Sequence, residues 1–317
     1  MTTRTVYSNR DYADDCDRQA IYQLLVACRP SGRQNDFPSP HDLDEIVAQL
    51  PHRYHIALWE DNARMAAGFA LVDLVFKNLY FEVAPEARDG SLAAEAIAWA
   101  AGCLRHVVGG VNPDLTLDTA CFEDDAWRLA VLEQHGFVVQ PVRTLTFFRS
   151  LSEPIGEPLL PPGFHVRSAT GEQEAEALTA LHRAAFGTEH MTVEERLAMM
   201  RVPGYDRALD LIAIAPDKSL AGYCFCSISH EDGSCLGHTD PVATRPRFQR
   251  LGLARALMLT GLRKLKERGA ETVILGTSSE NVAMQQTAES AGFLLAWSKV
   301  WLSMPISSGA GDSKVVP

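Results

Sequence analysis

The same succession of secondary-structure elements can be read twice along this chain of 317 residues. In each half a helix runs into a Gly-Phe pair and a strand follows, at Gly136-Phe137 in "AWRLAVLEQHGFVV" and at Gly292-Phe293 in "VAMQQTAESAGFLL". A proline-rich stretch without regular periodicity, residues 150–166, separates the two halves. We therefore expect two tandem domains of related α/β fold, residues 1–154 and 155–305, followed by a disordered tail over residues 306–317.

Hydrophobic periodicity is clearest in the second half. It predicts strands and helices in the order βααβββαβαβ, over residues 164–170, 171–187, 192–200, 209–215, 220–229, 240–244, 253–269, 272–278, 281–292 and 294–304. The first half repeats much of this order with weaker signals, over residues 17–28, 54–60, 66–75, 91–107, 115–120, 124–136 and 142–150. Each half is thus predicted to be one sheet with packed helices.

Charge and composition narrow the function classes. The net charge is −11, and residues 1–162 carry 13 lysines and arginines against 23 aspartates and glutamates. Such an acidic chain argues against nucleic-acid or anionic-membrane partners, and suits either cationic ligands or simple solubility. There is no signal-peptide pattern or bilayer-length apolar run, so we expect a cytoplasmic protein. The seven cysteines lack metal-ligand spacing, which favours free thiols and no metal site.

The stretch "DPVATRPRFQRLGLARALM", residues 240–258, gathers positive charge and a glycine before a predicted helix. If a strand ends near Thr244 and the helix begins at Leu253, the loop and the first helical turn point unpaired backbone N–H groups into one concavity. Gly252 would let an anion approach closely, and Arg245, Arg247, Arg250 and Arg255 would surround it with charge. The alternative is a surface loop with solvated arginines.

Two motifs carry a family resemblance. Residues 249–254, "QRLGLA", resemble the (Gln/Arg)-x-x-Gly-x-(Gly/Ala) pyrophosphate loop of the GNAT acyltransferase superfamily, and "NVAMQQTAESAGF" resembles that family's Asn-x-x-Ala-x-x-Leu-Tyr-x-x-x-Gly-Phe segment. The resemblance spans residues 163–303 and implies a GNAT fold with acetyl-CoA as co-substrate. The residues that it implies contact the cofactor are Val242, Ala243, Thr244, Gln249, Arg250, Leu251, Gly252, Leu253, Ala254, Arg255 and Asn281.

The first half resembles the same family only in degraded form. In "PEARDGSLAAEA", Gly90 stands in for Gly252, Ala87 for the glutamine and Leu92 for the final small residue, so we expect no cofactor there. Two GNAT-like halves with the intact loop in the second also resemble the architecture of mycothiol synthases. The acceptor of those enzymes does not follow from this likeness.

The resemblance also gives Pro241 a role. In the family two central strands splay apart, and a proline lacks the N–H that a continuous ladder would need. The pantetheine arm is then expected to lie in the gap against the backbone of Val242 and Ala243, where an N–H can bind the thioester oxygen. The alternative is an ordinary edge or bulge proline.

Acyl transfer to an amine needs a route for the proton that the amine loses. Asp240 and His238 lie two residues apart on the predicted strand, so either can serve as the base; alternatively they are a turn carboxylate and a residue that fills the sheet face. The family's tyrosine, which usually protonates the thiolate, falls on Ala288, where the register implies a side chain facing the thioester. Tyr223, on an earlier strand, is a remote substitute.

Two functions fit these residues. The first is an acetyl-CoA-dependent N-acyltransferase that transfers an acyl group to a small-molecule amine by direct attack. The second is a noncatalytic acyl-CoA-binding or regulatory module, which Ala288 and the degenerate first half favour. An intact loop at residues 249–254 supports CoA binding in both.

Overall fold

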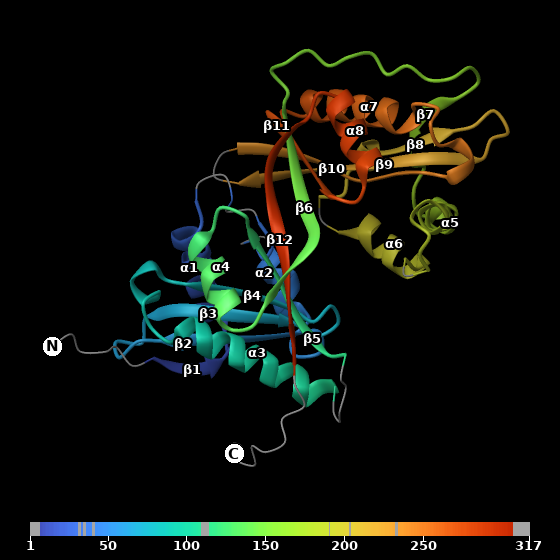
Figure 1. The fold of residues 1–317 in the computed structure, drawn as a ribbon. Coiled ribbons are helices and arrows are strands. Elements are labelled where there is room, and N and C mark those ends of the chain that lie inside the picture. Colours follow the sequence, from blue (N-terminus) through green and yellow to red (C-terminus); the bar gives the residue numbers. More distant parts are fainter. Residues whose placement is uncertain are drawn as a thin grey trace. The chain divides into compact units, whose positions relative to one another are not determined.

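The chain folds into two compact units. The computed structural model describes residues 7–30, 33, 36–39, 42–108, 114–189, 191–202, 204–231 and 234–306. Unit 1 comprises the chain up to Pro141 together with the stretch that begins at Lys299, and unit 2 comprises Val142–Ser298. Each unit is a mixed sheet with helices packed on it (Figure 1).

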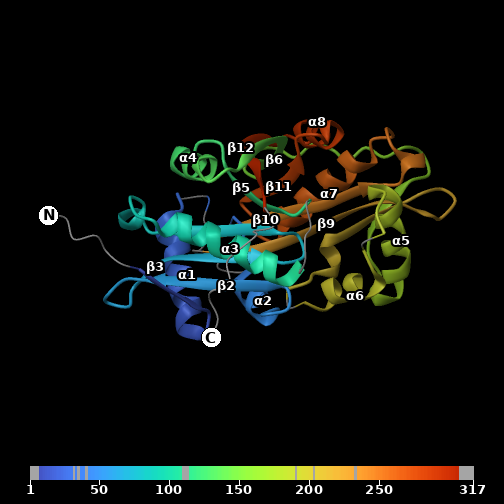
Figure 2. The ribbon, with the colours of Figure 1, turned by 60° about the horizontal axis from the view of Figure 1, so that its bottom comes forward.

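Unit 1 has its strands in the order β1-β2-β3-β4-β5-β12. Neighbouring strands are antiparallel except for the parallel pair β4 and β5. The elements that lie wholly in this unit are β1 (Ser8–Asp11), α1 (Asp15–Cys28), α2 (Asp42–Ala48), β2 (Tyr54–Glu60), β3 (Ala66–Asp73), β4 (Asn78–Val83), α3 (Leu92–Val108), β5 (Thr116–Phe122) and α4 (Ala126–Gln134). Helices α1 and α3 both pack on β3 and β4 (Figure 2). Trp59, Phe69 and Leu104 are fully buried in the resulting core.

Unit 2 repeats this arrangement with the strand order β6-β11-β10-β9-β8-β7, in which β10 and β11 form the parallel pair. The elements that lie wholly in it are β7 (His165–Ser168), α5 (Ala175–Phe186), α6 (Val193–Arg201), β8 (Asp210–Ile214), β9 (Leu220–Glu231), β10 (Ser234–Thr244), α7 (Leu253–Glu267), β11 (Thr272–Ser278) and α8 (Val282–Ser290).

The two faces of the unit 2 sheet carry different helices. Along β9, Cys224 and Cys226 pack into one hydrophobic cluster with Leu257 of α7, whereas Tyr223 packs into another with Leu178 of α5. Successive strand residues point to opposite faces of a sheet. Helices α7 and α5 therefore cover opposite faces, which we call the α7 face and the α5 face (Figure 1).

The last strand of each half belongs to the sheet of the other unit. Strand β6 (Val138–Ser150) follows unit 1 in the chain but pairs with β11 in unit 2, from Thr144↔Ser278 to Ser150↔Thr272. Strand β12 (Leu294–Pro305) follows unit 2 but pairs with β5 in unit 1. The boundaries between the two compact units therefore fall inside β6 and β12. The predicted boundary, between residues 154 and 155, lies after the end of β6.

The predicted repeat is confirmed at the Gly-Phe pairs. Gly136 and Gly292 have φ of +86° and +88°, the left-handed conformation that ends many helices. The N–H of Phe137 donates to the carbonyl of Leu132, and that of Phe293 donates in the same way to Ala288. Both phenylalanines are buried, so each pair stops its helix and anchors the following strand in the core.

The predicted order of elements in the second half is also confirmed. Ile306, the first residue of the predicted tail, is buried, and its N–H donates to the carbonyl of Leu115. Residues 307–317 of that tail lie outside the described residues. In the described part of the chain, no helix has the length and apolar character needed to span a bilayer.

Candidate active site

Strands β10 and β11 of unit 2 form a fork. Their parallel ladder runs only from Leu236↔Thr272 to His238↔Ile274, and the strands diverge beyond it. On its other edge β10 pairs with β9 but shifts register between Thr239 and Val242, which leaves Asp240 and Pro241 as a bulge. The splayed strands expected from the family resemblance are therefore present, and Pro241 lies at the opening.

The bulge distributes side chains between the two faces. Thr239 is opposite Cys226 and Val242 is opposite Cys224, so both lie on the α7 face although they are three residues apart. Pro241 instead lines a pocket with Leu178 of α5. Residues 239–242 of β10 thus present side chains at the fork to both faces of the sheet.

The backbone of β10 offers unpaired groups to the fork. The N–H of Arg245 donates to Ala221 on β9, and alternate residues of a strand direct their backbone groups to the same side. The N–H of Ala243 therefore points to β9, while those of Val242 and Thr244 point to the side from which β11 has diverged. Pairing of the pantetheine arm with the backbone of Val242 therefore agrees with this geometry. Pairing with the backbone of Ala243 does not, because its N–H and C=O groups are turned toward β9.

A pocket with about 310 Å³ of open volume occupies the fork. Of the residues that line it, only Asp240 is ionisable. The lining residues are Phe186, Thr239, Asp240, Val242, Leu275, Gly276, Thr277, Asn281 and Met284.

The environment of Asp240 suits a proton acceptor. Protein atoms around the carboxyl group disfavour its charged form and raise its pKa to about 6, although a hydrogen bond from the Gly276 backbone acts in the opposite direction. The residue as a whole keeps solvent access at the mouth of the pocket. A base with a pKa near 6 is ionised at neutral pH and can still release its proton to water.

His238 does not join Asp240 in the pocket. Its Nε2 lies 3.0 Å from the Ser229 Oγ across the β9–β10 pair, and it is absent from the lining of the fork. The predicted shared face assumed a regular strand, and the bulge after Thr239 removes that regularity. The structure therefore places the Asp240 candidate at the fork and the His238 candidate away from it.

Next to the fork, the loop before α7 forms an anion cradle. Gly252 is the N-cap of α7 with φ of +79°, and Arg250 also has a left-handed φ of +62°. The backbone N–H groups of residues 250–255 donate to no acceptor among the described residues, whereas that of Ala256 donates to the Gly252 carbonyl. A Cβ on Gly252 would meet no protein atom within 4 Å. Unpaired donors beside open space at a helix N-terminus are suited to phosphate.

The arginines around the loop differ in their contacts within the protein. Arg247 reaches Ser219 Oγ at 2.7 Å and stacks on Phe248, and Arg255 Nε donates to the Ser290 carbonyl at 3.0 Å. Arg250 is exposed and forms no ion pair within the described residues. Arg247 is thus held by the β8–β9 turn and Arg255 by the end of α8, and the expectation that all four arginines supply charge around the loop stays a prediction.

Helix α8 contributes its N-terminus to the fork. Asn281 caps the helix by accepting from the Met284 N–H at 3.1 Å, and both residues line the pocket. Ala288 does not; it is fully buried among core side chains that include Leu253 and Phe293. The implied position of residue 288 facing the thioester is therefore wrong here, because the core has closed around the alanine.

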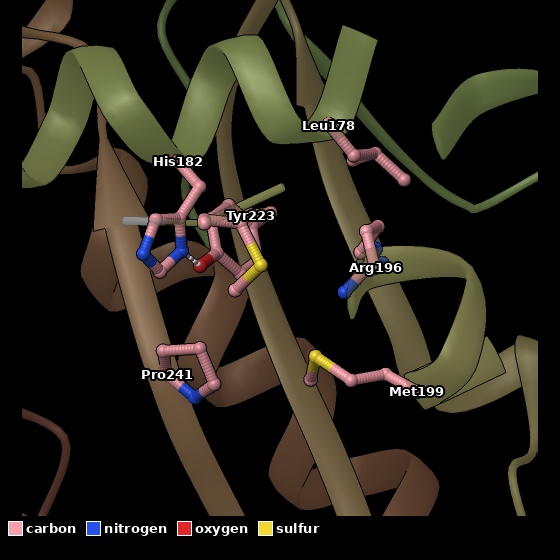
Figure 3. Close-up of a pocket in the computed structure, with 7 residues that line it drawn as sticks. Leu178, His182, Arg196, Met199, Tyr223 and Pro241 are labelled. Atoms are coloured by element: carbon pink, nitrogen blue, oxygen red, sulfur yellow. Dashed lines mark hydrogen bonds between the residues drawn. The ribbon is translucent and has the colours of Figure 1, made fainter. Parts of the chain in front are cut away.

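A second pocket lies on the α5 face, between α5, α6 and β9 (Figure 3). His182 Nδ1 and Tyr223 Oη share a hydrogen bond of 2.7 Å there, and burial raises the pKa of the tyrosine and lowers that of the histidine. Arg196 also lines it, but its charge is neutralised by an ion pair with buried Asp210. This pocket has about 260 Å³ of open volume and shares β10 with the fork through Pro241.

Sequence patterns did not single out His182 or Thr239, since each lies within an ordinary amphipathic element.

The equivalent loop of unit 1 lacks the cradle. Counting from the 3₁₀ turns that precede each loop, Pro85–Ala87 and Pro246–Phe248, places Ser91 rather than Gly90 opposite Gly252. Ser91 Oγ donates to Glu95 at 2.6 Å, which puts a carboxylate at the start of α3. A negative charge there opposes phosphate, and the expectation that the first half holds no cofactor stays a prediction.

Known proteins similar to this chain include members of one enzyme family. A model described as the acetyltransferase (GNAT) family matches residues 175–293, which include the fork and the cradle. These residues are similar to the GNAT acetyltransferase family. A mycothiol acetyltransferase from Saccharopolyspora erythraea is 27% identical over 269 residues, covering 77% of this chain and 83% of that protein. Another, from Cellulomonas flavigena, is 33% identical over 151 residues, 44% of this chain. The chain thus spans only 43% of the length of that relative.

Solved structures share the fold over nearly the whole chain. A tandem GNAT protein from the clavulanic acid biosynthesis pathway matches with a TM-score of 0.77 at 15% identity, covering 97% of this chain and all of that chain. A GCN5-related N-acetyltransferase from Sphaerobacter thermophilus matches with a TM-score of 0.76 at 21% identity, covering 98% of both chains. The predicted tandem GNAT fold is confirmed.

Proposed function

We propose that this chain is an acetyl-CoA-dependent N-acetyltransferase that acts on a small-molecule amine, with its chemistry in the fork of unit 2. The observation that carries the proposal is one continuous path along unit 2, from the unpaired N–H groups of residues 250–255 to the unpaired backbone of β10 and on to Asp240. Acetyl-CoA needs these features in the same order: N–H donors for its diphosphate, a strand edge for its pantetheine arm, and a proton acceptor beside its thioester.

Each part of the path has a distinct binding role. The cradle at residues 250–255 holds the diphosphate, with Arg250 as the nearby cation. The pantetheine arm lies along the open edge of β10, where Val242 and Thr244 offer their backbone groups as a neighbouring strand would. Asn281 lines the far side of the fork.

The acyl transfer itself then depends on positioning and on two protein groups. The Val242 N–H, which no strand takes up, donates to the thioester oxygen as negative charge develops on it. Asp240 accepts the proton that the attacking amine loses, directly or through water. Positioning contributes the larger part of the rate, about 7–11 kcal/mol in well-oriented systems.

The acceptor is expected to reach Asp240 from the α5 face. The pocket there adjoins the bulge at Pro241 and has apolar walls from Leu178, Met191 and Met199, with the His182 and Tyr223 pair as its polar part. It suits an amine with an adjoining apolar or hydroxylated group. Because several relatives are mycothiol acetyltransferases, the amine precursor of mycothiol is the first acceptor to test.

The proposal is tested by thiol release from acetyl-CoA with a panel of small amines that includes this precursor. We expect at least one amine to stimulate CoA release, and Asp240→Asn to lower it, while Asp44→Asn at an exposed position of unit 1 leaves it unchanged. If CoA binds but no amine releases it, the noncatalytic module is the correct function.

A further inference from the structure

His182 connects the two pockets of unit 2 that meet at the bulge of β10. Its side chain lines the pocket on the α5 face together with Pro241. Its ring centroid lies 4.6 Å from that of Phe186, which lines the fork pocket, as does Asp240, the neighbour of Pro241. His182 is therefore a wall of the space through which an acceptor on the α5 face approaches Asp240.

The hydrogen bond between His182 and Tyr223 fixes which nitrogen of the ring carries the proton. Tyr223 is 3% exposed, and burial raises the pKa of its hydroxyl, which therefore keeps its proton at neutral pH. Burial also lowers the pKa of His182, so its ring is uncharged and holds one N–H. Among the described residues the Tyr223 hydroxyl forms a single hydrogen bond, with Nδ1 of His182 at 2.7 Å. Because an unpaired buried donor is unfavourable, the tyrosine donates to Nδ1, and the N–H of the histidine is at Nε2.

The Nε2–H group of His182 is available to a bound molecule. Within the part of the chain that the structure describes, it donates to no acceptor. Figure 3 shows this nitrogen on the side of the ring away from Tyr223. His182 is only half-buried, whereas Tyr223 is enclosed, so a ligand atom can reach the histidine directly. Its natural partner is an oxygen atom of the acceptor.

The charges around this pocket favour a neutral oxygen over a carboxylate. Arg196 of the lining is paired with buried Asp210, so their charges cancel, and His182 is uncharged. Asp240 adds a negative charge that, besides burial, raises the pKa of Tyr223, so it lies near enough to act on the pocket. A net negative charge attracts an amine and repels a carboxylate. The oxygen at His182 is therefore expected to belong to a hydroxyl or a carbonyl group.

We propose that His182 donates a hydrogen bond from Nε2 to a hydroxyl or carbonyl oxygen near the amine of the acceptor, and thereby holds the amine toward Asp240. The inference rests on the proposed acetyl transfer and narrows its acceptor to vicinal amino alcohols, amino sugars and amines beside a carbonyl group. Tyr223 is a positioning residue that acts through the histidine. Neither residue exchanges a proton, and Asp240 remains the base.

The first test needs no substrate. Nitrogen NMR of the full chain with isotope-labelled histidine distinguishes protonated from unprotonated ring nitrogens at neutral pH, and comparison with His182→Gln assigns the signals of this ring. We expect Nε2 to be protonated and Nδ1 unprotonated in the wild type. Tyr223→Phe should raise the share of the Nδ1–H form, because nothing then donates to Nδ1. A proton on Nδ1 in the wild type would overturn the proposal, since Nε2 would then be an acceptor.

Two substitutions separate the roles of the two ring nitrogens. In His182→Asn the amide oxygen can still accept from Tyr223, but no donor reaches the position of Nε2; in His182→Gln the longer side chain places an N–H close to it. Each amine that is acetylated is assayed beside the analogue that lacks the neighbouring oxygen, starting with leucine amide and isoamylamine. We expect His182→Asn to lower kcat/KM about 3- to 10-fold for the oxygen-bearing amine alone, and His182→Gln to retain most of the activity. KM for acetyl-CoA should not change, and the control His165→Asn, at an exposed position of β7, should leave both amines unaffected.

The outcomes separate this inference from the proposed function. If the wild type acetylates both amines and His182→Asn slows them equally, the histidine has only a structural role and the inference fails. It also fails if leucine, with its free carboxylate, is a better acceptor than leucine amide. If the wild type releases CoA with no amine, the proposed function is refuted, and the acceptor role of His182 with it.

Discussion

Gly252 and Gly269 lie at opposite ends of α7 and form a matched pair of substitutions. Gly252 has φ of +79° and Gly269 has φ of +88°, and a Cβ at either would meet no protein atom within 4 Å. Alanine at either position therefore meets only the cost of the left-handed backbone, about 1–2 kcal/mol. For a protein of this size we expect each variant to lower Tm by about 2–8 °C, by similar amounts.

CoA affinity should separate the two variants. A methyl group at residue 252 stands among the N–H groups of residues 250–255, where it displaces the diphosphate; one at residue 269 is at the far end of the helix. Hydrogen bonds to a charged group contribute about 1.5–3 kcal/mol each, so losing one weakens binding by about 10- to 150-fold. Calorimetric titration with CoA measures both variants. If Gly252→Ala binds CoA within about threefold of Gly269→Ala, the cradle has been assigned to the wrong residues.

Three further outcomes follow from the same geometry. Because Asp240 must be ionised to accept a proton and its pKa is about 6, kcat/KM should fall as the pH drops below about 6, and Asp240→Asn should lose this limb together with most turnover; an unchanged pH profile contradicts its role as the base. Gly292→Ala should destabilise the chain more than Gly136→Ala in denaturant titrations, since a Cβ at Gly292 lies 1.5 Å from Nη1 of Arg149 and one at Gly136 meets nothing within 4 Å; equal losses would mean that Arg149 moves aside freely. Ala288→Tyr should cost about 1–3 kcal/mol by overpacking the core and should not raise turnover, and a faster enzyme would show that position 288 does reach the thioester.

The sequence was informative where the signal is local. The Gly-Phe helix ends and the glycine before α7 each require a left-handed backbone, and a glycine next to a periodic helix is visible without any knowledge of packing. The order of elements in the second half followed from hydrophobic period in the same way. Together with the family resemblance of residues 249–254 and 281–293, these local features predicted the fold class and the candidate cofactor loop.

Strand partners could not be predicted in this way. Nothing in residues 142–150 or 294–304 specifies which neighbour they pair with, because their alternation fits any sheet edge of suitable register. Which sheet β6 and β12 join is decided by tertiary packing. The proline-rich stretch therefore marks where the second half of the sequence begins, but not where the compact units divide.

The site was predicted in part for a similar reason. Asp240 and His238 were both predicted because acyl transfer needs a proton acceptor on the splayed strand, and placing them on one face assumed a regular strand. His182 gives no signal in the sequence, since a histidine in an amphipathic helix is ordinary until the side chain that it contacts is known. The directions of Arg247 and Arg255 likewise depend on neighbours distant in the chain.

The central claim is that one acetyl-CoA site lies in unit 2, running from the cradle to the fork. A crystal structure of the chain with acetyl-CoA tests this most directly. We predict diphosphate density at the N–H groups of residues 250–255, and the thioester carbonyl at the Val242 N–H beside Asp240. Density for the cofactor at the Ser91 loop of unit 1, with residues 250–255 empty, would contradict the account.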